Sequence, residues 1–508
     1  MSTGLSGAII FGLLVALMLT GMPISIALGI TVLAFLFTLP NIPIEIVSQR
    51  LFTGLDQFAI MAIPFFILSG GFLTTGGVAR RLVRFATSLV GWMHGGLAVS
   101  GVLACAFFAA VSGSSPATVV AIGSILIPAM MKQGFPKKFG VGVIATSGGL
   151  GILVPPSIVM IIYAVSTNSS VGRLFLAGVV PGVLMAATLM TVTWLVAKRR
   201  GYPVLVDAHW RGRAHAVGVR LVALLAALAV LAIPPALATW LIKLLLPAGA
   251  GGSALGVPIT LAWLIVAHLR IRPDTRLAAL FPPAGREVWE SFWDSIWGLL
   301  LIVVVIGGIY GGLFTPTEAA AVSAVYAGFV ALVIYRDMPW QKLGRVLLDS
   351  ANMSAMLLYI ITNATLFSFL LTSEKIPQQI ANWVIEQGLA PWMFLLFVNI
   401  LLFFAGDFME PSSIILILAP IFLPVAMELG IDPIHLGIIM TINMELGMIT
   451  PPVGLNLYVA SGLARMGLTE VTLAAAPWIL VVTAVLLLVT YVPEVSLWLP
   501  NLVYGKGG

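Results

Sequence analysis

The stretch GLGILVPPSIVMIIYA, residues 149–164, decides the fold because two adjacent prolines interrupt an otherwise apolar run. A second stretch, ELGMITPPVGLNLYVA at 445–460, repeats the pattern, and its double proline follows the first by 296 positions. Proline removes an amide donor and disfavours helix in the preceding residue. Each pair is therefore expected to split a helix into halves and free backbone carbonyls. A simple kink is the alternative interpretation, made weaker because the pattern occurs twice beside a polar motif.

That polar motif is also repeated. SGSSPATVVAIGSILIP at 112–128 aligns with GDFMEPSSIILILAPIFLP at 406–424 through two prolines, Pro116 and Pro411, which lie 295 positions apart. Two motifs that share nearly one offset indicate two structural repeats. Apolar arms flank each polar tip at 96–111 and 117–131, and at 392–405 and 412–427. They are short for membrane-crossing helices at 1.5 Å rise per residue. The arms predict two re-entrant hairpins, and two ordinary spans joined by a polar turn remain the alternative.

Composition places the chain in a bilayer. Hydrophobic residues make up 60% and charged residues 9% of the 508 positions, whereas soluble proteins carry about 25% charged residues. Several apolar runs, such as 296–314, 353–371 and 473–491, approach the roughly 20 residues that a crossing helix needs. The first apolar run lacks a basic start, so we expect a retained span with its N-terminus outside.

The order of the spans predicts that the two repeats have opposite orientations. Spans at 5–20, 22–39 and 58–74 put the amphipathic stretch 78–91 at the cytoplasmic surface. Spans at 296–314, 318–335 and 353–371 put the stretch 376–388 outside. With this order most of the 25 Lys and Arg residues lie on the cytoplasmic side, as the positive-inside rule requires. Inverted repeats with matching helix breaks are typical of a secondary transporter with a site near the midplane.

The predicted fold class is an all-α polytopic membrane protein with two inverted repeats, each with a re-entrant helical hairpin and a broken transmembrane helix. The expected parts are these: 1–75, scaffold spans; 76–200, the first-repeat surface helix, hairpin, broken helix and following span; 201–290, a linker with an extra transmembrane pair; 291–375, second-repeat scaffold spans; and 376–508, the second-repeat surface helix, hairpin, broken helix and last span.

The residues point away from enzymes and ATP-driven pumps. The sequence GxxxxGK[ST] is absent, and the five histidines are scattered without ligand spacing. Ser114 and Ser115 have no histidine partner suggested by the sequence, so a nucleophile with its base is not indicated. Freed carbonyls suit a hard cation such as sodium, and half-helix N-termini attract anions. A transporter is therefore favoured, and a membrane-bound enzyme or passive channel is the weaker alternative.

Four motifs in order resemble the large membrane subunit of tripartite ATP-independent periplasmic (TRAP) transporters. They are VSGSSPATVVAIGSILIPAM, GLGILVPPS, GIYGGLFTPTEAAAVSAVYA and MITPPVGLNLYVASG. The resemblance covers nearly the whole chain except roughly 211–283, which is longer than the family's usual link between the repeats and is expected to add a pair of spans.

The resemblance implies a sodium-coupled secondary transporter subunit in the bacterial inner membrane, with an elevator mechanism. Its expected cargo is a small carboxylate delivered by a periplasmic binding protein, and its expected partner is a small four-helix membrane subunit. Sodium ions would be transported as coupling ions. The alternative is a self-sufficient sodium–dicarboxylate symporter of the same superfamily, because nothing within the chain demonstrates a partner.

The resemblance also implies two sodium sites and a neighbouring anion site. The first sodium site would use Ser112 and Ser115 with backbone oxygens of Gly151, Val154 and Pro156. Its counterpart in the second repeat would use Gly406, Met409, Gly447, Thr450 and Pro452. The expected neighbours of the anion are Ser114, Thr118 and Asn456.

Four acidic residues receive separate interpretations. Asp407, Glu410 and Glu445 lie near the second tip and break, where each either helps to hold sodium or faces water; for Asp407 we favour the exposed interpretation. Glu318 is expected to begin a helix capped by Thr315 or Thr317.

Overall fold

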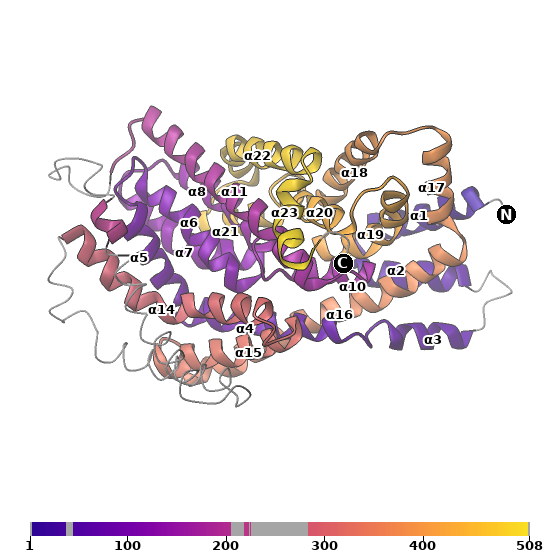
Figure 1. The fold of residues 1–508 in the computed structure, drawn as a ribbon, viewed down its shortest axis with the longest axis horizontal. Helices are drawn as coiled ribbons and strands as arrows, with labels where there is room; N and C mark the ends of the chain where they lie inside the picture. Colours follow the sequence, from indigo (N-terminus) through magenta and orange to yellow (C-terminus); the bar gives the residue numbers. More distant parts are fainter. Residues whose placement is uncertain (1–2, 37–43, 205–217, 223, 225–282, 506–508) are drawn as a thin grey trace.

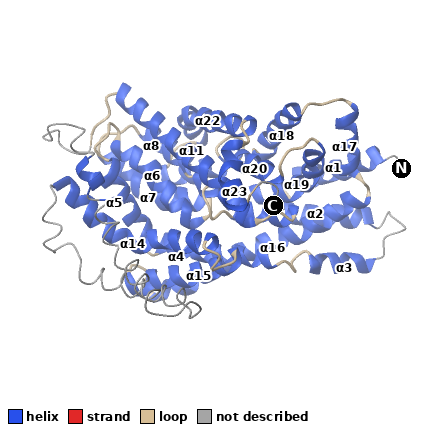
Figure 2. Ribbon diagram, in the orientation of Figure 1, coloured by secondary structure: helices blue, strands red, loops and turns tan. Residues whose placement is uncertain are grey.

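The chain is helical throughout the part described by a computed structural model, which comprises residues 3–36, 44–204, 218–222, 224 and 283–505. These residues form helices and connecting loops without a strand (Figure 2). Eight of their helices are long and apolar enough to cross a membrane, and the count rises to nine if one bent pair is a single span. This finding confirms the predicted all-α polytopic class.

The helices of the first half follow the predicted order. They are α1 (Thr3–Leu19), α2 (Ile24–Leu36), α3 (Ile44–Thr53), η1 (Phe58–Met61), α4 (Ala62–Thr75), α5 (Val78–Val90), α6 (Gly96–Ser112), α7 (Ser115–Lys132), α8 (Lys137–Ser147), α9 (Leu150–Leu153), α10 (Ile158–Thr167) and α11 (Val171–Arg199).

The second half repeats this order from its long first helix onward. Its helices are α14 (Pro283–Tyr310), α15 (Pro316–Phe329), η3 (Val330–Ile334), η4 (Trp340–Lys342), α16 (Leu343–Ser373), α17 (Ile376–Glu386), α18 (Pro391–Gly406), α19 (Pro411–Glu428), α20 (Pro433–Met448), α21 (Leu455–Ala464), α22 (Leu468–Tyr491) and α23 (Glu494–Tyr504).

Both double prolines break their helices, as predicted. The first broken helix stops at Leu153 and resumes at Ile158, and the two parts are bent by 40°. The second stops at Met448 and resumes at Leu455. Because a helical amide bonds to the carbonyl four residues earlier, the four prolines remove the usual donors to the carbonyls of Gly151, Ile152, Gly447 and Met448.

Each repeat packs one of its half-helices against the hairpin of the other repeat. The half-helix α10 of the first repeat packs on α19, an arm of the second hairpin, and α21 of the second repeat packs on α7 of the first. Figure 1 shows the two hairpins on opposite sides, α6 and α7 on the left and α18 and α19 on the right. A second pair of contacts also joins the repeats. Helix α8 of the first repeat packs on α22 of the second, and α11 of the first packs on α20 of the second. The polar tips and the breaks are thereby brought to the centre of the molecule.

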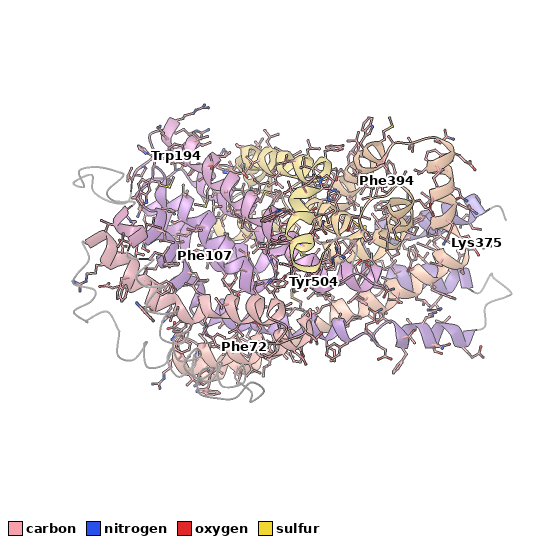
Figure 3. The ribbon with its side chains drawn as sticks, viewed as in Figure 1. Phe72, Phe107, Trp194, Lys375, Phe394 and Tyr504 are labelled. Atoms are coloured by element: carbon pink, nitrogen blue, oxygen red, sulfur yellow. The ribbon has the colours of Figure 1, made fainter. Side chains whose placement is uncertain are left out.

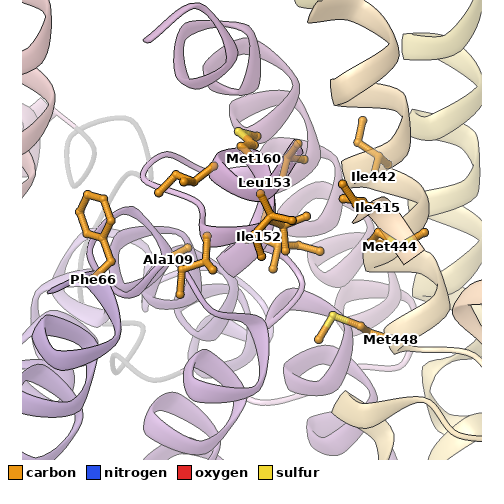
Figure 4. Packing of buried hydrophobic residues seen from close by; sticks show 14 of the residues in the cluster. Phe66, Ala109, Ile152, Leu153, Met160, Ile415, Ile442, Met444 and Met448 are labelled. Atoms are coloured by element: carbon orange, nitrogen blue, oxygen red, sulfur yellow. The ribbon is translucent and has the colours of Figure 1, made fainter. Parts of the chain in front are cut away.

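The centre is packed with apolar side chains around the first break. In Figure 4, Ile152 and Leu153 lie between Ala109 of α6 and the group formed by Ile415 and Met444 of the second repeat. All five side chains are buried, with at most 3% of their surface exposed. This packing holds the short helix α9 in place although it is only four residues long.

Helices α5 and α17 lie at opposite ends of the molecule. The helix α5 lies at the left end in Figure 1, and Lys375, labelled in Figure 3, lies at the right end beside α17. Arg81 of α5 forms ion pairs with Asp294 and Asp337, and its guanidinium stacks on the Tyr335 ring at 3.7 Å. Arg84 adds a pair with Glu290 at 3.6 Å. These contacts fix α5 to helix α14 and to the loop residue Asp337.

Several elements differ in length from the prediction. Helix α14 begins at Pro283, whereas the predicted span began near 296. The hydropathy of its first turns is low because they carry charged residues, which pair with α5. Helix α16 begins at Leu343 rather than near 353, and α3 and α23 were not predicted. The expected extra spans within 211–283 lie almost entirely outside the described residues.

A close contact between α8 and α22 gives a test of this packing. A Cβ atom at Gly142 would lie 2.2 Å from the Ala474 carbonyl oxygen and 2.9 Å from the Trp478 ring. We expect Gly142→Ala to lower the free energy of unfolding by about 1–3 kcal/mol through overpacking. Thermal unfolding in detergent, followed by tryptophan fluorescence, measures the change.

Gly462→Ala is the matched control, because that glycine lies in helix α21 with nothing within 4 Å of an added Cβ. Alanine there is expected to leave stability unchanged or raise it by about 0.5–1 kcal/mol, since alanine favours helix. Equal unfolding temperatures for the two variants would contradict the packing of α8 against α22.

Candidate functional site

The first hairpin tip rests on the first break. Helix α6 ends at Ser112, Gly113 turns the chain with φ +63°, and α7 begins at Ser115. A Cβ at Gly113 would lie 2.8 Å from the Pro156 carbonyl oxygen. Glycine is needed here both for the left-handed turn and for this close approach. The carbonyl of Gly113 also accepts a 3.5 Å bond from the Ile158 amide.

Gly151 makes the second close contact between this tip and the break. A Cβ at Gly151 would lie 2.5 Å from the Ser114 carbonyl oxygen and 2.8 Å from Thr118 Oγ1. Thr118 Oγ1 donates to the Ser114 carbonyl at 2.8 Å and lies 3.2 Å from Ser112 Oγ. Thus hydroxyl and carbonyl oxygens of the tip gather beside Gly151. Val154 lies in the extended segment that follows, and Pro156 lies against Gly113.

The second tip and break form the corresponding contact. The backbones of Gly406 and Gly447 touch, because a Cβ at Gly447 would lie 2.6 Å from the Gly406 Cα atom. Thr450 Oγ1 donates to the Asp407 carboxylate at 2.6 Å, and the Val453 amide donates to the Asp407 carbonyl at 3.1 Å. The predicted positions Gly406, Gly447 and Thr450 are therefore adjacent.

The remaining two predicted positions of this set lie toward its edge. Pro452 is exposed, and the Met409 side chain lines an apolar cavity of about 700 Å³ between α1 and the second hairpin. A carboxylate needs polar partners, which this cavity does not supply. The tips, rather than this cavity, are the candidate site.

One hydrogen bond joins the two repeats at the site. Asn456 Nδ2, at the start of α21, donates to Ser115 Oγ at the start of α7 over 2.6 Å. The predicted anion neighbours Thr118 and Asn456 are completely buried, and Ser114 is half-buried. The structure therefore brings all three to one place, where two helices begin.

The four helices that begin at the tips and breaks are capped differently. Ser157 caps α10 by accepting from the Met160 amide, and Glu410 caps α19 by accepting from the Ser413 amide. Helices α7 and α21 have no side-chain cap. Unpaired amides and the helix dipole make such N-termini suitable for an anion.

Three acidic residues take definite positions here. Asp407 is only 6% exposed, so the interpretation that it faces water is wrong; its hydrogen bond from Thr450 holds it inside. Glu410 caps α19. Glu318 forms a capping box with Thr315 at the start of α15, as expected.

Two polar residues were missed by the sequence interpretation. Ser157 replaces a lost amide donor, because its Oγ donates to the Ile152 carbonyl at 2.5 Å. A serine directly before an apolar helical run is an N-cap signal that identifies it. Asn443 Nδ2 donates to Asn399 Oδ1 at 2.6 Å and thereby ties α20 to α18; its sequence carries no comparable signal.

The comparison with known proteins agrees with this architecture. The family described as "Tripartite ATP-independent periplasmic transporter, DctM component" matches residues 11–261 and 232–495. The C4-dicarboxylate TRAP transporter large permease protein DctM of Rhodobacter capsulatus is 53% identical, over 98% of this chain and 99% of the relative.

The chain is also similar to two other proteins. The isethionate TRAP transporter permease protein DctMQ of Oleidesulfovibrio alaskensis is 34% identical, over 96% of this chain and 66% of the relative. The YdaH transporter of Alcanivorax borkumensis, a solved structure, has a TM-score of 0.43 and 18% identity, over 87% of this chain and 88% of that chain.

The match to the family covers most of the sequence, and the two curated relatives align over 98% and 96% of the chain. The chain therefore belongs to the TRAP transporter family as its DctM component, the large permease subunit.

Proposed function

We propose that this subunit imports a C4-dicarboxylate together with sodium ions by elevator-type alternating access. The observation that carries the proposal is the contact between the uncapped N-termini of α7 and α21, linked by Asn456 and Ser115. One carboxylate group can accept hydrogen bonds from amides at both N-termini. The two tip and break contacts beside it supply carbonyl and hydroxyl oxygens for cations.

Family membership fixes the setting. The chain is a multi-pass protein of the inner membrane, and its relatives are permease subunits rather than enzymes. The name of the Rhodobacter relative supports a C4-dicarboxylate as cargo, since that relative is 53% identical over nearly the whole chain.

The predicted sodium ligands enter the proposal as two sets. Ser112, Ser115, Gly151, Val154 and Pro156 form one set, and Gly406, Met409, Gly447, Thr450 and Pro452 form the other. In each set a tip and a break are in contact, and prolines have removed two amide donors nearby. Carbonyl oxygens without their usual donors are suitable ligands for sodium.

Alternating access is supported by a difference between the two repeats. Pro155 and Pro156 are buried, whereas Pro451 and Pro452 at the equivalent positions are exposed. Tyr458 is 52% exposed, whereas Ile162, the equivalent residue in the first repeat, is completely buried. When two inverted repeats adopt different conformations, the centre opens toward one side of the membrane. When each repeat adopts the conformation of the other, the centre opens toward the opposite side.

We further propose the tripartite assembly with a small four-helix membrane subunit and a periplasmic binding protein. The relative named DctMQ extends well beyond the region that matches this chain, which agrees with a further membrane component in that protein. The self-sufficient symporter is less favoured, because the close relatives carry TRAP transporter names.

Reconstitution tests the proposed function directly. Proteoliposomes that contain this chain and its small subunit should accumulate labelled succinate only with an inward sodium gradient and the substrate-loaded binding protein. Replacing external sodium with choline should abolish the uptake. Uptake of free succinate by this chain alone would contradict the tripartite proposal, and equal uptake in choline would contradict sodium coupling.

A second prediction concerns the link between the repeats. Ser115→Ala removes the acceptor of the buried Asn456 amide, and an unsatisfied buried donor costs about 1–3 kcal/mol. We expect uptake at limiting sodium to fall by roughly 5-fold to 150-fold, as that energy implies. Ser124→Ala in the same helix is the control, because Ser124 is exposed and, within the described part of the chain, bonds only to the local Ala121 carbonyl. Equal uptake by both variants would remove Ser115 from the site.

A further inference from the structure

Glu445 lies where the two broken helices meet. Counted by the offset of the double prolines, its equivalent in the first repeat is Gly149, and these two residues are in direct contact. A Cβ atom at Gly149 would lie 2.4 Å from both Glu445 Cγ and Glu445 Oε1. When a residue contacts the residue at the equivalent position of the other repeat, both lie at the pseudo-twofold axis that relates the two repeats. The absence of a side chain at Gly149 makes room for the carboxylate.

The Glu445 carboxylate has no neutralising partner among the described residues. The side chain is completely buried, and neither Oε1 nor Oε2 forms a hydrogen bond there. The ion pairs of the described chain involve other residues, such as Arg81 and Arg84 of α5. An unpaired buried carboxylate is costly, so a positive charge near it stabilises the folded protein.

The position of Glu445 relates it to both proposed sodium sets. It lies two residues before Gly447, which belongs to the second set. It touches Gly149, which lies two residues before Gly151 of the first set. The one carboxylate at the axis is therefore placed between the two tip and break contacts.

We propose that Glu445 is the shared counter-charge for the two sodium ions and makes their binding cooperative. This inference rests on the proposed sodium coupling. The first ion to bind reduces the cost of the buried carboxylate and draws the two broken helices into their closed arrangement. The second ion then binds to a preformed site. Sodium is cargo here, and Glu445 acts on it through the electrostatic field rather than as a direct ligand.

The experiment is a sodium titration of succinate uptake by the reconstituted complex, with the small subunit and the loaded binding protein present. For Glu445→Gln, which keeps the shape and removes the charge, we expect the half-saturating sodium concentration to rise at least about fivefold. The Hill coefficient for sodium should fall toward unity. Glu470→Gln is the matched control, because that side chain is 56% exposed on α22, and its titration should equal that of the wild type.

The outcomes separate this inference from the proposed function. Sodium-independent uptake by the wild type would overturn both. A sodium-dependent wild type with an unchanged Glu445→Gln titration would overturn the counter-charge alone, and it is the result expected if Glu445 holds a proton throughout the cycle. A higher sodium affinity in Glu445→Gln than in the wild type would also overturn the counter-charge proposal.

Two more variants distinguish loss of the charge from misfolding of the protein. Glu445→Asp keeps the charge and should retain cooperativity, whereas Gly149→Ala should displace the carboxylate and reduce it. Sodium-induced thermal stabilisation of the purified complex gives a second measurement for each variant. The stabilisation should be smaller in Glu445→Gln than in the wild type at every sodium concentration below saturation. Equal stabilisation in the two proteins would contradict the proposal.

Discussion

The structure depends on one constraint, which is that backbone polar groups within a bilayer must find partners inside the protein. Two double prolines violate this constraint at the centre of the molecule by removing amide donors from two helices. The hairpin tips approach these breaks so closely that glycine is required at Gly113, Gly151, Gly406 and Gly447. Ser157 supplies a hydroxyl in place of one lost amide. The breaks are thus tolerated only because the tips meet them.

The exchange of half-helices between the repeats follows from the same constraint. A hairpin whose polar tip lies inside the protein leaves that tip and both arms in need of packing partners. Helix α10 covers α19 and α21 covers α7, so each repeat completes the hairpin of the other. The hydrogen bond between Asn456 and Ser115 lies at one of these crossings. Neither half is therefore expected to form the site alone, which explains why both motifs occur twice in one chain.

The sequence predicted the hairpins, the breaks and the inverted order, because each rests on a local signal that occurs twice. The missed features depend on contacts between distant segments. Asp407 was expected to face water, yet it is buried through its bond with Thr450, 43 residues away. The early start of α14 follows from ion pairs with α5 that hydropathy does not reveal. The sodium ligands remain predictions, because they were assigned by resemblance and nothing in the protein's own contacts tests ion occupancy.

A residue at the pseudo-twofold axis has a special property in an inverted-repeat transporter. In the alternating access proposed above, the tips and breaks of the two repeats change their surroundings, and the unequal exposure of Pro156 and Pro452 supports this proposal. Glu445 and Gly149 are in contact at the axis, and an exchange of conformations between the repeats would leave this pair in contact. In the proposed cycle, a charge at this position would stay beside both sodium sets during the movement. Its charge and its position at the axis together make this carboxylate suitable for the proposed coupling.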